Sequence, residues 1–143
     1  MAPATLSNLP LQVLIYFNGW YDVVFVLAMF ALYIWKGTQL PYDGFWWIFA
    51  LEVCLVPVLG MVEYCRLFLA SRGNKIERSG PLILSCILAP LSGVIFFYFL
   101  YLQVYVARAD VILSGIGLGF IGLELLISLL VVVSLIRAPP QAT

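Results

Sequence analysis

Residues 111–136 read VILSGIGLGFIGLELLISLLVVVSLI, a run whose only charged side chain is Glu124. An apolar run of about 20 residues is long enough to cross the hydrocarbon core of a membrane as a helix. Three runs of similar character precede it, at 10–35, 45–70 and 81–106. We therefore expect an all-α membrane protein in which four transmembrane helices form one bundle, as a single domain over 1–143.

The composition supports this class. The chain is 64% hydrophobic and 10% charged, whereas soluble domains are about 45–50% apolar and about 25% charged. The net charge is zero, so no global field favours nucleic acid. The chain has no histidine, which removes the commonest general base and metal ligand. Because no P-loop, dinucleotide-binding, zinc-protease or nucleophile-elbow motif is present either, we expect no enzymatic activity, cofactor or metal.

The cysteines point away from thiol chemistry. They form no C-x-x-C pair and all lie in apolar segments, so we expect them to be buried like other small hydrophobic residues. They are Cys54, Cys65 and Cys86.

Basic residues predict the orientation. An even number of spans places both termini on the same side of the membrane as the polar segment 71–80. The positive-inside rule then favours cytoplasmic termini, because that side holds more Lys and Arg. The two sets are Arg66, Arg72, Lys75, Arg78 and Arg137 against Lys36 and Arg108.

A basic loop lies within the polar segment. Arg72, Lys75 and Arg78 anchor the topology and can contact anionic lipid, although they are fewer than the clusters of about 4–8 that recognise such lipids.

Four acidic residues fall inside the spans, where each carboxylate costs at least about 2.5 kcal/mol. Arg66 follows Glu63 by three positions, so the two can pair along one helix. We expect this pair near the cytoplasmic end, with access to water. Glu52 has no evident mate. The acids are Asp22, Glu52, Glu63 and Glu124.

Glu124 poses the sharpest question, because it lies near the middle of the last span. Gly117, Ile121 and Ser128 share its helical face, which should point inward. Asn18 and Asp22 are four residues apart and lie at a similar depth, where no basic residue is expected. We hypothesise that Glu124 is protonated or hydrogen-bonded to this first-span pair.

A second face of the last span carries Gly115, Gly119 and Gly122, with G-x-x-x-G spacing. At 3.6 residues per turn, this face lies nearly opposite Glu124. Small residues let a second helix approach closely, so these glycines are a candidate partner-binding face in a homo- or hetero-oligomer.

Two functions remain open from the residues alone. One is a non-enzymatic assembly component that presents helix faces to membrane lipids and partner proteins. The alternative is a small proton-coupled transporter that uses Asp22 and Glu124. The acids are scattered over three helices and several depths, which favours the first.

A set of collinear motifs resembles the transmembrane protein 17 family, most closely its transmembrane protein 216 and transmembrane protein 80 branch. The match extends over nearly the whole chain. Its pieces are Leu9-Pro10-Leu11-Gln12-Val13-Leu14, Asn18-Gly19-Trp20-Tyr21, Lys36-Gly37, Leu40-Pro41-Tyr42, Glu63-x-x-Arg66-Leu67-Phe68, Arg72-Gly73-Asn74, Pro81-Leu82, Gln103-x-Tyr105-Val106-x-Arg108 and Glu124-Leu125-Leu126.

The resemblance implies a tetraspan protein of the ciliary transition zone with cytoplasmic termini. It implies tectonic and B9-domain proteins as partners, a part in the diffusion barrier at the cilium base and in ciliogenesis, and no enzymatic activity. Asp22 departs from the family pattern, in which a neutral residue is usual, so no role is carried over to it. The family's characteristic positions correspond here to Asn18, Gly19, Trp20, Glu63, Arg66, Gly73, Asn74 and Glu124.

Overall fold

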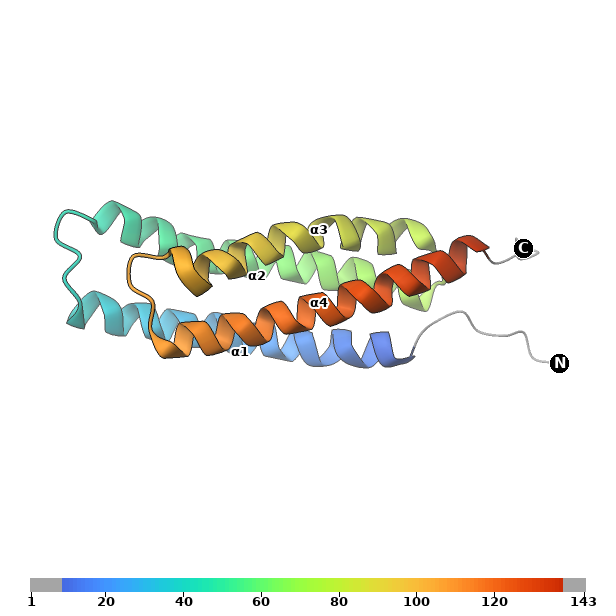
Figure 1. Ribbon diagram of the computed structural model, residues 1–143, viewed down its shortest axis with the longest axis horizontal. Coiled ribbons are helices and arrows are strands. Elements are labelled where there is room, and N and C mark those ends of the chain that lie inside the picture. The colour runs from blue at the N-terminus through green and yellow to red at the C-terminus, as the bar shows by residue number, and fades with distance from the viewer. Residues whose placement is uncertain (1–8, 138–143) are drawn as a thin grey trace.

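The computed structural model describes residues 9–137, and four long helices run side by side along its longest axis (Figure 1). Within these residues, all four are long and apolar enough to cross a membrane. The predicted all-α four-helix membrane fold is therefore confirmed. The helices are α1 (Leu9–Gln39), α2 (Trp46–Lys75), α3 (Ser79–Phe97), which continues through the one-turn π-helix η1 (Tyr98–Leu102), and α4 (Arg108–Arg137).

The helices form a ring in chain order. Contacts join α1 to α2, α2 to α3, α3 to α4, and α4 back to α1. Short connections make successive helices antiparallel, as in other up-and-down bundles. The start of α1 and the end of α4 therefore lie at one end, which we call the terminal end (Figure 1). At the opposite, distal end, the α1–α2 connection projects beyond the α3–α4 connection.

Inside the ring, polar and apolar layers alternate along the axis. Two apolar clusters fill most of the interior, whereas many large apolar side chains cover the outside, as expected for a bundle solvated by lipid. The cluster nearer the distal end is built from Phe25, Met29, Tyr33, Val56, Leu59, Ala89, Ile95, Phe96, Phe99 and Ile121. The cluster nearer the terminal end is built from Leu11, Ile15, Leu67, Ala70, Leu82, Val131 and Val132.

The α2–α3 connection is shorter than the predicted polar segment 71–80. Helix α2 continues to Lys75, so only residues 76–78 join it to α3. Gly73 permits this close turn, because a Cβ there would lie 2.8 Å from the backbone nitrogen of Leu82. Arg72 and Lys75 therefore lie on the last helical turn of α2 rather than in a loop.

The third helix is also shorter than predicted. It ends at Leu102, and the backbone of Gln103 is extended, with φ −69° and ψ 158°. The third span was predicted to extend to Val106 because the apolar run continues that far. Residues 103–106 instead belong to the connection that leads to α4. The cysteine prediction was wrong as well: Cys54 and Cys65 are exposed on the outer surface of the bundle, and Cys86 is half-buried.

Candidate functional site

The central polar layer separates the two apolar clusters. It consists of buried side chains from all four helices, and we define it as Asn18, Asp22, Glu63, Arg66, Ser92 and Glu124. Arg66 is its centre, with 2% of its surface exposed. Burying a polar side chain is costly unless it forms hydrogen bonds, so the bonds within this layer indicate its role.

Arg66 holds two carboxylates at once. Its Nε donates to Glu63 Oε1 at 2.9 Å, and its Nη2 donates to Glu63 Oε2 at 2.8 Å. The third donor, Nη1, reaches Glu124 Oε2 at 2.8 Å. Because α2 and α4 are not neighbours in the ring, this guanidinium connects diagonally opposite helices through the core. The planar fork of arginine makes such a two-sided bridge possible.

These bonds confirm one expectation and correct two. Glu63 and Arg66 do pair along α2. They lie in the buried centre of the bundle rather than at a water-accessible end. Glu124 has a cationic partner at its depth, contrary to expectation, because the long Arg66 side chain crosses from another helix. Asn18 lies near Glu124, yet its amide makes no hydrogen bond with a described residue.

Asp22 is the acid of this layer without a bond. Only 9% of its surface is exposed, and neither carboxylate oxygen has a hydrogen-bond partner among residues 9–137. Asp22 lies within electrostatic reach of Glu63, Arg66 and Glu124. The layer thus contains three carboxyl groups and one guanidinium, and Asp22 is the group that Arg66 does not bind.

A second buried network lies at the distal end. Lys36 is fully buried, and its Nζ lies 2.5 Å from Asp110 Oδ2 and 3.0 Å from Gln103 Oε1. Tyr33 donates to the same Gln103 oxygen at 2.8 Å, and its ring lies 4.7 Å from Lys36 Nζ. Asp110 also accepts the backbone N–H of Ala107 at 2.9 Å. This network ties α1 to the α3–α4 connection through Gln103 and to the first turn of α4 through Asp110.

Sequence reasoning missed this network because Lys36 looked like a residue at the membrane surface. A signal was present: Asn18, Asp22, Phe25, Met29, Tyr33 and Lys36 follow each other at spacings of three or four, so all six lie on the buried face of α1. Nothing in the sequence marked Asp110 as the partner, because the pairing depends on where the α3–α4 connection turns.

Glu52 also has the partners that the sequence did not reveal. Its Oε1 accepts the Tyr98 hydroxyl at 2.9 Å and the Val104 backbone N–H at 2.8 Å. Val104 lies beyond η1, where its N–H has no intrahelical acceptor, and the Glu52 carboxylate supplies one. Glu52 therefore stabilises the end of the third helix at this point, and the backbone beyond that end gives the buried carboxylate a partner.

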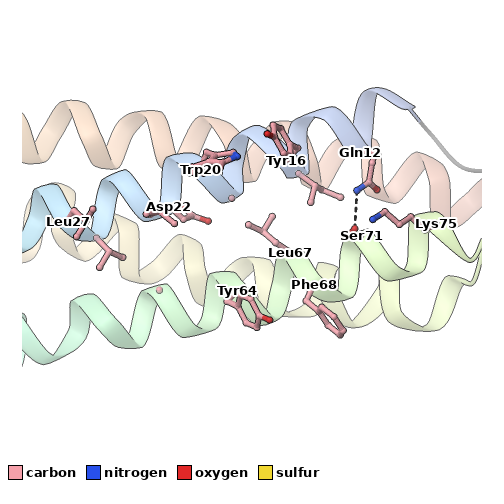
Figure 2. Close-up of a pocket in the computed structure, with 15 residues that line it drawn as sticks. Gln12, Tyr16, Trp20, Asp22, Leu27, Tyr64, Leu67, Phe68, Ser71 and Lys75 are labelled. Carbon is pink, nitrogen blue, oxygen red and sulfur yellow. Dashed lines mark hydrogen bonds between the residues drawn. The ribbon is translucent and has the colours of Figure 1, made fainter.

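At the terminal end, polar groups join α1 to α2. Gln12 donates to the Ser71 hydroxyl at 3.0 Å and accepts from the Asn74 amide at 3.2 Å. From this point a groove of about 710 Å³ runs between the two helices, as Figure 2 shows. Its walls are mostly apolar, and Asp22 and Lys75 are the ionisable acid and base along it. Its lining is Gln12, Ile15, Tyr16, Gly19, Trp20, Asp22, Val23, Val26, Leu27, Gly60, Tyr64, Leu67, Phe68, Ser71 and Lys75.

The other predicted positions lie on the outside. Arg72, Lys75 and Arg78 are exposed. The outward glycines of α4 are open as well: nothing lies within 4 Å of a Cβ built on any of them. Their use as a partner face stays a prediction. They are Gly115, Gly119 and Gly122.

The inward glycine of α4 is different. A Cβ on Gly117 would lie 2.5 Å from Cε1 of the buried Phe96 ring. The two glycine faces of α4 therefore differ: the face with Gly117 packs inside the bundle, and the face with Gly115, Gly119 and Gly122 is open on the outside.

Comparison with known proteins identifies the family of this chain. Residues 13–121 match the model of a family described as "Predicted membrane protein", Transmemb_17. Transmembrane protein 216 of Homo sapiens is 37% identical over 139 residues, covering 96% of this chain and 94% of that protein. The Mus musculus protein of the same name is 38% identical over 132 residues, covering 91% and 92%. The Danio rerio protein is 35% identical over 133 residues, covering 93% and 82%.

No solved structure matches the chain. The family model covers well over half of the chain, and these relatives align with it along nearly its full length. The chain belongs to the Transmemb_17 family of membrane proteins.

Proposed function

We propose that this protein is a non-enzymatic tetraspan component of the membrane complex at the ciliary transition zone. There it supports the diffusion barrier at the cilium base and ciliogenesis, with both termini in the cytoplasm. Its partners are other transition-zone proteins, namely the tectonic and B9-domain complex, and the surrounding lipids. The proposal rests on family membership together with the way in which this chain uses its charges.

One observation carries the proposal. Five of the buried charged groups form ion pairs. Lys36 on α1 pairs with Asp110 at the start of α4, and Arg66 on α2 pairs with Glu124 on α4, while Glu63 holds Arg66 from within α2. Buried ionic contacts of this kind fix the register between helices, at a cost that purely apolar packing would avoid. A bundle held in one arrangement presents fixed outer faces, which is what an assembly component requires.

A capture experiment tests the proposal. A tagged copy, expressed at native level in ciliated cells and extracted with mild detergent, is expected to retain tectonic and B9-domain proteins. Arg66→Met serves as the folding-defective comparison, since it removes the central bridge. Recovery of a well-folded wild-type chain without these partners would contradict the proposal.

A small proton-coupled transporter is a second candidate, and Asp22 is the observation that favours it. A buried acid without a bonded partner, beside a groove, is a common feature of proton pathways. Against it, Glu124 is held by Arg66. Proton-driven flux in liposomes that contain this protein alone, abolished by Asp22→Asn, would establish the transporter and overturn the assembly role.

A further inference from the structure

We propose that the groove between α1 and α2 binds one anionic phospholipid, with its phosphate at Arg72 and Lys75 and one acyl chain lying along the groove. This inference goes beyond the proposed function and does not depend on it. It rests on the groove's shape, its lining and the position of the two cations.

The walls of the groove suit an acyl chain. Trp20 on α1 faces the same space as Tyr64 and Phe68 on α2, and Figure 2 shows these side chains along its length. Its volume of about 710 Å³ lies within the range of about 300–1,000 Å³ that is typical of ligand sites. Gly19 keeps the α1 wall open, since nothing lies within 4 Å of a Cβ built there.

The length of the groove also fits. On α2 the lining extends from Lys75 to Gly60, and about 15 helical residues span roughly 22 Å. Half of a hydrocarbon core is about 15 Å thick. A chain that starts at headgroup level beside Lys75 can therefore stay within the groove to the middle of the membrane.

The terminal end of the groove carries the complementary charge. Lys75 lines it together with Gln12 and Ser71, and an adjoining cavity of about 360 Å³ adds Arg72. Both cations are exposed on the last turn of α2, at the end of a helix long enough to span a membrane, and we place them at headgroup level. A phosphate placed there would meet two positive charges and nearby hydrogen-bonding groups, while the acyl chain meets walls that are mostly apolar.

This charge complementarity favours a lipid over a second transmembrane helix. A helix in the groove would place its own end beside Arg72 and Lys75, and it would need an acidic residue at that level. Anionic lipids supply the negative charge directly in the leaflet. Each Lys or Arg near the membrane surface strengthens binding to such lipids by about fivefold.

Quenching of Trp20 tests the proposal. Replacing Trp35, Trp46 and Trp47 with Phe leaves Trp20 as the sole tryptophan, on the wall of the groove with 61% of its surface exposed. In vesicles of phosphatidylcholine, brominated phosphatidylserine is expected to quench Trp20 with an apparent affinity at least about fivefold above that of brominated phosphatidylcholine. The double change Arg72→Gln and Lys75→Gln should reduce that preference to near unity.

Matched variants separate the site from general surface charge. Arg137→Gln removes an exposed cation at the same end of the bundle, away from the groove, and should keep the preference. Gly19→Leu fills the groove and should abolish the preference with both cations intact, whereas Gly115→Leu on the outer face of α4 should not.

Three results would overturn the proposal. Equal quenching by the two lipids would mean that Trp20 meets only the general lipid surroundings. Weak quenching by both would mean that another helix or a second copy covers the groove. A preference that survives in the Arg72/Lys75 double variant would mean that the headgroup binds elsewhere.

Discussion

Replacing Arg66 with Met is expected to destabilise the bundle strongly. The change removes all three charge-assisted hydrogen bonds of the central layer and leaves Glu63 and Glu124 buried without their cation. Loss of one member of a buried ion pair costs about 3–5 kcal/mol. Because Arg66 is 2% exposed, water cannot easily replace it. We therefore expect a loss of unfolding free energy in this range, measured by denaturant titration in detergent micelles.

A companion variant distinguishes lost bonds from lost packing. If the penalty comes from the two orphaned carboxylates, changing Glu63 and Glu124 to Gln in the Arg66→Met background should recover most of the lost stability. Replacement of a whole buried ionic group by well-packed hydrophobic residues is often neutral or stabilising, and Gln likewise removes both charges, although its amides remain polar. Arg66→Lys should fall between the two, because a single ammonium cannot form the bidentate fork.

A small effect would refute this reasoning. If Arg66→Met changes the unfolding free energy by less than about 0.5 kcal/mol, it behaves like an ordinary surface substitution. An equal loss in the triple variant would show that the volume of Arg66, and not its charge, holds the helices together.

Three further predictions use the same stability measurement. Asp22→Asn is expected to leave stability unchanged or to raise it by up to about 1 kcal/mol, because the carboxylate it removes has no bonded partner; a loss above about 2 kcal/mol would contradict this. Lys36→Met should cost about 3–5 kcal/mol, since it leaves the buried Asp110 carboxylate without its cation, and a neutral effect would show that water enters the distal end. Gly117→Ala should cost about 1–3 kcal/mol through overpacking, whereas Gly115→Ala on the open face should be neutral or stabilising by about 0.5–1 kcal/mol; similar effects for both would disprove the assigned faces of α4.

Composition and apolar run length were sufficient to predict the helices, because a membrane core imposes both. Helical periodicity also placed Glu124 on the buried face of α4 with Gly117, Ile121 and Ser128. These features depend on one helix at a time, so a single sequence contains them.

The partners of the buried charges could not be predicted in the same way. Arg66 reaches Glu124 only because α2 and α4 face each other across the ring, and Glu52 reaches Val104 only because the third helix ends early. Such pairings depend on helix rotation and on the path of the connections. The long side chains of Arg66 and Lys36 also reach partners on other helices at a different depth from their own Cα atoms. Counting residues along one helix gives only the depth of the Cα atom.

The position of the protein in a ciliated cell tests the central proposal most directly. A tagged wild-type copy at native expression level, imaged with markers for the basal body and the axoneme, is expected to concentrate in the short zone between them. Uniform distribution over the cell membrane or internal membranes, by a chain that remains folded, would contradict a transition-zone role.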